Sequence, residues 1–466
     1  MYNNVPLAEK CPTTLMLSSD TTEGLEMATQ RLAAWMRQAC KPGRAAWPLD
    51  AVAAALRDRC RPLPLRRAIR VESWQDALTA LADRSRQTTA AALPGPPKVF
   101  LSFPGQGSLR PGVLSRLVLS TPAWARHLER YAQLGRGLSG FDIMDWLGDP
   151  DADADSVLKD NAKTQLAIFC VSASLGRGLF ELGLRPAGYI GHSLGEWVGA
   201  NLAAVLSDKD AVRAVHHRGR LMQASGPGAA LIVRSTLDAL APLLAETRGE
   251  RAGAASGAPS RGGMGPLRGS PSLDVALACV NAPNLCLVSG RPDAVAACAK
   301  KLADARIVAH PAPIHVAVHS AVMDAVIVPF LRELTPLAFA APKTPMLSTV
   351  TGEWMSDEQV RDREYWTRQL RRPVRFDKAV ATLMQEPSAI VLEVGMGAAL
   401  TSLVQAQTRG RNNIRTFALF GRDEPPDQGY DPGRVHQTLA ELWTSGVLMD
   451  PVGYVKPTRP APDVPG

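Results

Sequence analysis

The chain has 466 residues, of which 46% are hydrophobic, a size that suits two or three folded units with sizeable cores. Its seven cysteines form no C-x-x-C pair and have no neighbouring histidine ligands, which argues against a disulfide framework and a zinc site. No run of about 18 apolar residues is present and the N-terminus is polar. We therefore expect no transmembrane helix, no signal peptide and a cytoplasmic protein.

The net charge of +8 favours an acidic partner. Nucleic acid is the general partner of basic proteins, yet the sequence holds no helix-turn-helix, zinc-finger or aromatic-interleaved basic motif. We therefore expect neither nucleic acid nor a membrane as partner. A high-GC coding background explains the surplus of arginine as well as an acidic partner does.

Residues 1–96 are predicted to form a small α/β unit, because short apolar runs alternate with amphipathic stretches. The expected strands are Thr14–Ser19 and Arg67–Val71, and the expected helices are Thr21–Ala39, Leu49–Arg59 and Ser73–Arg84. The stretch Ala91–Pro97 is rich in proline and glycine, which predicts a linker to the next unit.

The most informative stretch is Gly191–Glu196, in which Ser193 follows the apolar run Ala187–Ile190. A short buried strand before G-x-S-x-G is the pattern of a nucleophile elbow, where small neighbours allow a sharp turn that exposes the serine oxygen. The helix behind the serine directs its first N–H groups toward a developing oxyanion. Hydrolases, thioesterases and acyltransferases share this pattern, and a strand–turn–helix joint with an inert serine is the structural alternative.

Two further segments accompany the elbow. Upstream, Val99–Phe103 is predicted to be a buried strand, and the glycine-flanked turn Pro104–Ser108 lets backbone N–H groups approach a ligand closely. Downstream, helices are expected at Glu196–Leu206 and, after a Ser-Asp cap, at Lys209 to about Gln223. This pair of helices would bring Arg218 back toward the serine.

With these segments in place, the chain resembles the malonyl-CoA:acyl carrier protein transacylase and polyketide-synthase acyltransferase family. The matching landmarks follow the family's order over about residues 98–420. They are Phe103–Ser108, Gln165, Gly191–Glu196, Arg218–Met222, Val280–Pro283, Val288–Gly290, His319-Ser320, Met323, Ser348–Gly352, Tyr365-Trp366, Leu370–Phe376 and Leu392–Gly395.

The resemblance implies an α/β fold. A large α/β-hydrolase-like body with a parallel sheet is expected from residues 98–222 and 316–420, and a small ferredoxin-like insert from residues 223–315. Within the insert, Ala230–Val233 and Ala276–Val280 are predicted strands, and a mobile loop is expected at about 246–272. Residues 1–96 resemble the linker between a ketosynthase and an acyltransferase. Residues 421–466 are then a post-acyltransferase linker, with an extended proline-rich tail from Tyr454.

The resemblance also implies a catalytic pair, with Ser193 as nucleophile and His319 as base. A serine hydroxyl needs a base within hydrogen-bond reach, and histidine has the suitable pKa. The chain has eight histidines, and only the family match selects His319 among them. In the family a backbone carbonyl orients the histidine, and the position that supplies it matches Gln369. A core histidine satisfied by backbone groups is the structural alternative for His319.

Substrate-binding roles follow from the same match. The oxyanion hole corresponds to the backbone N–H groups of Gln106 and Leu194, and Arg218 corresponds to the arginine that grips the free carboxylate of the acyl group. A planar guanidinium is well shaped to hold a carboxylate through two hydrogen bonds. A solvated helix face is the structural alternative for Arg218.

Substrate choice depends on the tetrad from Val316 to His319. In the family, His-Ala-Phe-His accompanies malonyl and Tyr-Ala-Ser-His accompanies methylmalonyl, and Val-Ala-Val-His fits neither. Val318 is smaller than phenylalanine, although a methylene-sized change is worth only ~1–3 kcal/mol. Leu194 favours malonyl. Leu166 and Met396 depart from the family pattern, so an unusual extender unit stays open.

We therefore expect transfer of a carboxyacyl unit, malonyl first, from coenzyme A to the phosphopantetheine thiol of an acyl carrier protein, through an acyl-serine and without a cofactor. A ketosynthase is expected as partner through the N-terminal linker. The alternatives are an acyl-carrier-protein hydrolase, which Arg218 disfavours, a non-catalytic docking scaffold, and a serine hydrolase using His436. No ketosynthase or carrier-protein motif is present, so a discrete protein and a part of a larger synthase both stay open.

Overall fold

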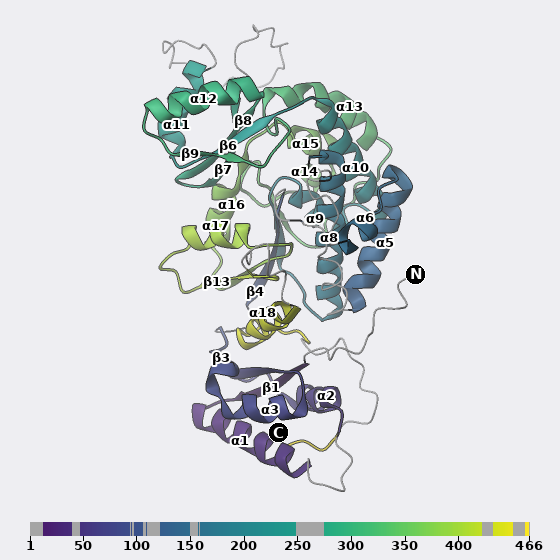
Figure 1. The fold of residues 1–466 in the computed structure, drawn as a ribbon, viewed down its shortest axis with the longest axis vertical. Coiled ribbons are helices and arrows are strands. Elements are labelled where there is room, and N and C mark those ends of the chain that lie inside the picture. Colours follow the sequence, from purple (N-terminus) through teal and green to yellow (C-terminus); the bar gives the residue numbers. More distant parts are fainter. Residues whose placement is uncertain are drawn as a thin grey trace.

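The computed structural model describes residues 13–39, 47–93, 95, 97–105, 109, 122–149, 157, 159–247, 275–421, 432–450 and 462–465. Three of the predictions fall wholly or mostly outside these residues, namely Gln106, the loop at about 246–272 and the tail from Tyr454. The described residues form three sheets, in an N-terminal unit, a large body and an insert. Figure 1 shows the N-terminal unit and the insert at opposite ends of the body.

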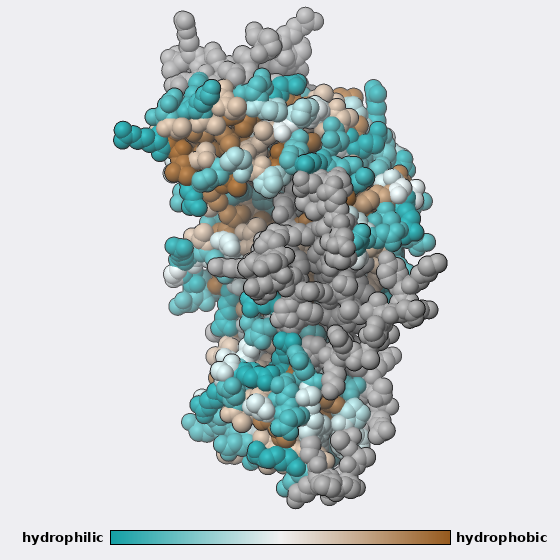
Figure 2. All heavy atoms as spheres, in the orientation of Figure 1, coloured by the Kyte–Doolittle hydropathy of each residue, from teal (hydrophilic) through white to brown (hydrophobic). Residues whose placement is uncertain are grey.

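The N-terminal unit is an antiparallel sheet in the order β1-β2-β3 with helices packed against it. Its elements are β1 (Thr13–Ser19), α1 (Thr22–Ala39), α2 (Leu49–Arg59), β2 (Leu65–Val71), α3 (Trp74–Ala82), η1 (Arg84–Arg86) and β3 (Gln87–Ala91). The third strand was not predicted, because its sequence QTTAA is short and has no large apolar residue. It forms because its backbone pairs with β2 over Leu65–Ile69. In Figure 2, hydrophilic residues cover much of the outer surface of this unit.

The C-terminal helix α18 (Pro432–Thr444) completes this unit and lies between it and the large body (Figure 1). Ala440 and Trp443 belong to the same buried cluster as the strands and helices of the N-terminal unit. The guanidinium of Arg66 donates to the Trp443 carbonyl at 2.9 Å and lies 5.3 Å from the centre of the Trp443 ring. Residues 13–91 and α18 therefore share one core.

The large body has a parallel sheet in the order β10-β5-β4-β12-β13. Its strands are β4 (Lys98–Phe103), β5 (Gly188–Gly191), β10 (Met346–Leu347), β12 (Ala389–Glu393) and β13 (Ile414–Ala418). The sequences VFLSF and AIVLE are buried throughout, as expected where helices cover both faces of a parallel sheet. The parallel arrangement brings the carboxyl ends of β4 and β5, and the loops after them, together at one edge.

Helices cover this sheet. They are α5 (Pro122–Ser139), α6 (Ile143–Gly148), α8 (Asn161–Glu181), α9 (Gly195–Leu202), α10 (Asp208–Ala224), η2 (Ala321–Met323), α13 (Asp324–Leu334), α14 (Asp357–Arg361), α15 (Arg363–Arg368), α16 (Phe376–Leu383) and α17 (Ala399–Gln407). Helix α9 is shorter than predicted, because Ala204 adopts a left-handed φ of 62° and the Val205 N–H closes the helix on the Ala200 carbonyl. The Ser207 side chain caps α10 as expected.

The insert runs β6 (Ala229–Val233), α11 (Leu237–Thr247), β7 (Val275–Ala282), β8 (Leu285–Gly290), α12 (Pro292–Asp304) and β9 (Ala309–Ala312). Its strands pair antiparallel in the order β7-β8-β6-β9, which is the ferredoxin-like arrangement. A fifth strand, β11 (Val374–Arg375), pairs parallel with β7. This strand comes from the range predicted for the body, so the body and the insert are joined by strand pairing. Among the described helices, none is both long and apolar enough to cross a bilayer.

Candidate active site

Ser193 occupies a strained turn between β5 and α9. Its φ is 54°, in the left-handed region that residues other than glycine rarely adopt. The turn requires glycine on both sides: a Cβ at Gly191 would overlap the backbone N of Glu196, and a Cβ at Gly195 would overlap the Phe103 carbonyl oxygen. The elbow predicted from G-x-S-x-G is therefore present, with the serine held between β5 and the start of α9.

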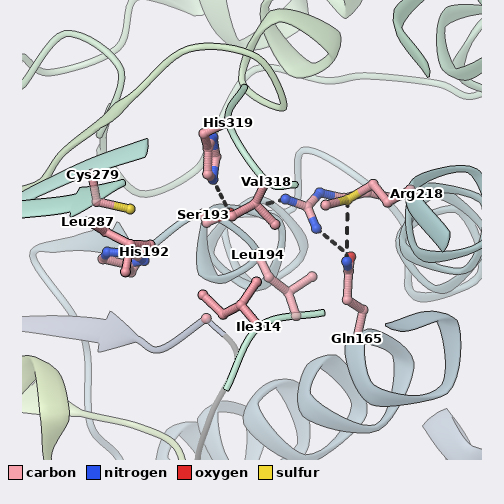
Figure 3. A pocket seen from close by; sticks show the side chains of 12 residues that line it. Gln165, His192, Ser193, Leu194, Arg218, Cys279, Leu287, Ile314, Val318 and His319 are labelled. Carbon is pink, nitrogen blue, oxygen red and sulfur yellow. Dashed lines mark hydrogen bonds between the residues drawn. The ribbon is translucent and has the colours of Figure 1, made fainter. Parts of the chain in front are cut away.

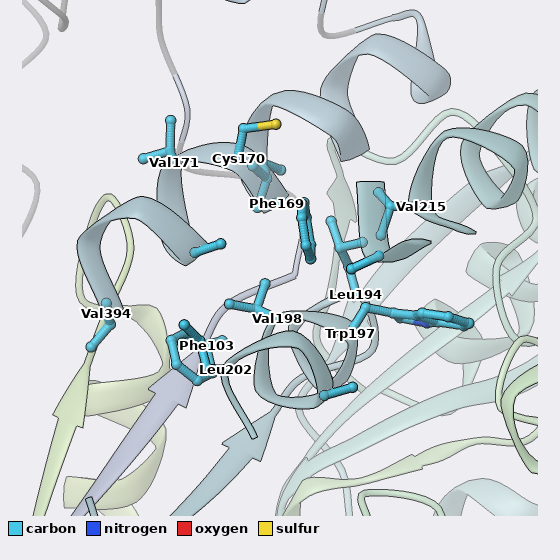
Figure 4. Packing of buried hydrophobic residues seen from close by; sticks show 14 of the residues in the cluster. Phe103, Phe169, Cys170, Val171, Leu194, Trp197, Val198, Leu202, Val215 and Val394 are labelled. Atoms are coloured by element: carbon cyan, nitrogen blue, oxygen red, sulfur yellow. The ribbon is translucent and has the colours of Figure 1, made fainter. Parts of the chain in front are cut away.

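The elbow rests on a packed core. Trp197 and Val198 of α9 lie in the same buried cluster as Phe103 of β4 and Phe169 of α8, and Figure 4 shows these side chains around α9. The Trp197 ring also lies 4.7 Å from that of Trp366, measured between ring centres. This packing fixes the helix whose first residues follow Ser193.

His319 lies within hydrogen-bond distance of the serine. Its Nε2 is 2.8 Å from Ser193 Oγ, and its Nδ1 is 2.8 Å from the Arg372 carbonyl oxygen. Because a carbonyl only accepts hydrogen bonds, Nδ1 carries the proton and the lone pair of Nε2 faces the serine. The ring is 2% exposed, and burial, with smaller effects of Arg218 and His192, lowers its pKa to about 3. The histidine is therefore neutral at pH 7 and able to accept a proton.

The carbonyl that orients His319 differs from the predicted one. The sequence comparison pointed to Gln369, whereas the hydrogen bond goes to Arg372, and the Gln369 carbonyl has the smaller effect on the pKa of the ring. The physical reason is a turn after α15. The N–H groups of Arg371 and Arg372 both donate to the Arg368 carbonyl, and this turn directs the carbonyl of Arg372 toward the imidazole of His319.

Arg218 approaches the serine from another side than His319 does (Figure 3). Its Nη2 donates to Ser193 Oγ at 3.1 Å, and its Nη1 donates to Gln165 Oε1. The side chain is only 2% exposed, so it is not part of a solvated helix face. Burial lowers its pKa to about 9, against the opposing effect of Glu196, which leaves a positive charge at neutral pH. A buried cation beside the serine oxygen is a ready partner for a carboxylate.

The backbone positions of the predicted oxyanion hole lie partly outside the described residues. Leu194 directly follows Ser193 at the start of α9, whereas Gln106 is not described. The end of β4 reaches the elbow all the same, because the His192 N–H donates to the Phe103 carbonyl at 2.9 Å. A Cβ at Gly105 would lie 3.0 Å from the His192 carbonyl oxygen.

A cavity opens over the serine between the body and the insert. The residues that line it are Gly105, Gln165, His192, Ser193, Leu194, Arg218, Met222, Cys279, Leu287, Ile314, Val318 and His319. Of the predicted specificity residues, Leu194 and Val318 line the cavity, whereas Val316 packs into the core.

Sequence reasoning missed Cys279, Leu287 and Ile314, which form an apolar wall of the cavity. Only the pairing of β7 with β8 and the return of the chain to the body bring them to the serine. His192 ties this wall to the elbow, because its Nε2 lies 2.8 Å from Asn281 Oδ1.

Comparison with known proteins identifies the family. The acyl transferase domain family matches residues 99–241 and 243–447. The chain belongs to this family. It is 31% identical over 382 residues to a component of the phenolphthiocerol/phthiocerol polyketide synthase of Mycobacterium tuberculosis, an alignment that covers 82% of the chain and 23% of that synthase component. The chain thus spans about a quarter of the length of that relative.

Solved structures agree with this assignment. The acyl transferase domain of SpnD, in complex with 2-(pent-4-yn-1-yl)malonyl, is 29% identical with a TM-score of 0.78, over 95% of this chain and 98% of that one. A complex of a malonyl-transacylase with its type II polyketide-synthase acyl-carrier protein is 25% identical with a TM-score of 0.58, over 69% and 95% of the two chains. The predicted family and fold class, an α/β-hydrolase-like body with a ferredoxin-like insert, are confirmed.

Proposed function

We propose that this acyltransferase domain moves a carboxyacyl unit, malonyl first, from coenzyme A to the phosphopantetheine thiol of an acyl carrier protein. The observation that carries the proposal is the buried guanidinium of Arg218, 3.1 Å from Ser193 Oγ. An acyl group on that oxygen would place its free carboxylate beside the guanidinium. A hydrolase of uncharged acyl groups has no use for such a cation, and burying it unpaired is costly.

In the first half-reaction, Ser193 Oγ attacks the thioester carbonyl while His319 Nε2 takes its proton. The backbone N–H of Leu194 and, by family resemblance, that of Gln106 would hold the oxyanion, and one such donor is typically worth on the order of 10²–10³ in rate. Collapse of the tetrahedral intermediate breaks the C–S bond, and His319 returns the proton to the coenzyme A thiolate. These steps use no metal or redox cofactor.

In the second half-reaction, the phosphopantetheine thiol gives its proton to His319 and attacks the acyl-serine. The tetrahedral intermediate then expels Ser193, which takes the proton back from the histidine. The Arg372 carbonyl would keep the imidazole in the required tautomer through both halves, since it accepts the Nδ1 proton throughout.

The proposal leaves two candidates for the acyl group, which differ in the size of the substituent on the acyl Cα. Val318 and the wall formed by Cys279, Leu287 and Ile314 are apolar, which suits a substituent on the acyl Cα. Malonyl needs no such room, so an alkylmalonyl group is the second candidate substrate. The related SpnD domain, solved with a pentynylmalonyl group, supports this alternative.

The proposed partners are acyl-CoA, a carrier protein and, through the N-terminal unit, a ketosynthase. The related malonyl-transacylase solved with its carrier protein and the polyketide-synthase relatives support the carrier protein as acceptor. A hydrolase on the same fold would use water in place of the thiol, and the two functions differ only in the product of deacylation.

Intact-protein mass after incubation with a panel of acyl-CoAs tests the loading step. We expect a mass increase with malonyl-CoA and none in Ser193→Ala. A carrier protein is then added and the products are separated: faster formation of acyl-carrier protein than of free acid supports transfer. Rapid release of free acid with little transfer would identify a hydrolase instead.

A further inference from the structure

One short segment of the chain bonds both Ser193 and His319. The Gln369 side-chain N–H donates to the Ser193 carbonyl at 2.6 Å, and the Leu370 carbonyl accepts the His319 backbone N–H at 3.1 Å. The Arg372 carbonyl then holds the imidazole at 2.8 Å. Residues 369–372 are therefore hydrogen-bonded to Ser193 at one end and to His319 at the other, so this one segment links the two residues.

Both residues that this segment holds are strained. Ser193 and His319 each have a φ of 54°, and neither is glycine. A left-handed conformation costs such residues roughly 1–2 kcal/mol and persists only where neighbouring contacts enforce it. The hydrogen bonds from residues 369–372 are such contacts, and they act directly on the peptide groups that are strained.

Glu196 lies beneath the elbow, where it is 1% exposed. Its carboxylate accepts the Thr349 N–H at 2.6 Å, the Tyr365 hydroxyl at 3.0 Å and the Gln369 side-chain N–H at 3.2 Å. The Thr349 hydroxyl also contacts the carboxylate. Because these hydrogen bonds converge on it, the carboxylate is well placed to fix the amide of Gln369.

The orientation of the Gln369 amide follows from its neighbours. Its Nε2 lies between the Ser193 carbonyl and the Glu196 carboxylate, two groups that only accept hydrogen bonds. An amide oxygen in that position would face two acceptors. The side chain therefore donates both of its N–H groups, one to each partner, and links the carboxylate to the elbow.

We propose that Gln369 is a positioning residue that fixes Ser193 relative to His319, and that Glu196 holds Gln369 in place for this purpose. The inference rests on the proposed roles of Ser193 and His319, and it does not depend on the acyl group. Gln369 does not line the cavity over the serine, so its effect is on the geometry of the pair and not on contact with substrate.

A fluorophosphonate probe, which reacts with an activated serine and needs no acyl-CoA, tests the proposal. Gln369→Ala should slow labelling of Ser193 by roughly 10- to 100-fold, the scale expected for a misplaced reacting group. In malonyl loading, kcat should fall by a similar factor while KM stays unchanged. Gln359→Ala is the matched control, because this half-buried glutamine lies on α14 away from the serine.

Two further variants separate positioning from folding. Gln369→Asn keeps an amide donor, so it should label faster than Gln369→Ala; equal rates would overturn the role of the donor. Glu196→Gln should slow labelling in the wild-type background and add little in the Gln369→Ala background, because the two residues act in series. Independent, additive losses would overturn the part assigned to Glu196.

The proposal as a whole is overturned if Gln369→Ala, folded as judged by its thermal midpoint, labels at the wild-type rate. The proposed acyl transfer can fail separately. A wild-type protein that labels readily but loads no acyl group would refute the transfer function and leave the positioning role of Gln369 intact.

Discussion

Two buried basic side chains flank Ser193, and burial acts on them with different results. The guanidinium of Arg218 keeps its charge at neutral pH, since its pKa remains about 9. The imidazole of His319 loses its charge, since burial and the neighbouring guanidinium lower its pKa to about 3. At the scale of single residues, Ser193 therefore lies beside one buried cation and one neutral imidazole.

The charge of Arg218 makes a prediction about substrate preference. Arg218→Ala should lower kcat/KM for malonyl-CoA by between about 30-fold and several-thousand-fold, because a carboxylate stripped of its buried partner costs roughly 2–5 kcal/mol. Acetyl-CoA has no carboxylate and should be spared or improved. Arg220→Ala, exposed on the same helix, is the control. An unchanged ratio of the two kcat/KM values would remove the carboxylate contact from the proposal.

The low pKa of His319 predicts the pH dependence of acylation. From about pH 5 to 8 the ring stays neutral, so kcat/KM for loading should show no histidine limb in this range. An ordinary histidine would lose activity as the pH falls through about 6.5. Quench-flow measurements of coenzyme A release provide the profile, and a midpoint near 6.5 would show that the ring is solvated in the free enzyme.

The same shift has a consequence for stability. Between the unfolded pKa of about 6.5 and the folded value, the unfolded chain binds a proton that the buried ring does not. The His319 contribution to the free energy of unfolding is thus present above pH 6.5 and is lost as the pH falls toward about 3. Loading rates below pH 5 should be corrected for the folded fraction.

At the scale of elements, local rules explain why the elbow could be predicted from the sequence. Gly191 is required by the backbone of Gly195 and Glu196, a few residues along the chain, and the cap of α10 by Ser207 is equally local. The contact that requires glycine at position 195 is with Phe103, which is distant in sequence. The orienting carbonyl of Arg372 could not be identified in this way. Every residue has a carbonyl, so only the turn after α15 decides which one reaches His319.

Replacing glycine by alanine should have opposite effects on the free energy of unfolding at Gly195, where the backbone is crowded, and at Gly137, where it is not. Gly195→Ala should lower the free energy of unfolding by about 1–3 kcal/mol and impair loading, because its Cβ would overlap the Phe103 carbonyl. Gly137→Ala, on the exposed face of α5 with no atom near the new Cβ, should gain about 0.8–1.0 kcal/mol from helix propensity. Denaturant unfolding measures both, and a tolerated Gly195→Ala would refute the tight elbow.

At the scale of the whole molecule, the cavity and the joins between units depend on contacts between distant segments. Cys279 and Ile314 reach the serine only through the topology of the insert, and β11 joins the insert to the body with two residues. Short strands such as β3 and β11 carry too few apolar residues to be recognised by periodicity. The family resemblance predicted the order of the units along the chain, whereas the contacts between the units could be identified only from the structure.

The contact between α18 and the N-terminal unit, called the seam here, predicts which part of the molecule unfolds first. Trp443 is 5% exposed and lies beside Arg66, whose guanidinium is satisfied by main-chain carbonyls. Trp443→Ala should destabilise this unit by about 3–5 kcal/mol, because it leaves a cavity and removes the ring over a buried cation. Limited proteolysis should then cut within residues 13–91 first. Malonyl loading should persist, because Ser193, His319 and Arg218 lie in the body, outside both α18 and residues 13–91. Loss of loading in step with proteolysis would instead show that the N-terminal unit and the catalytic body unfold as one.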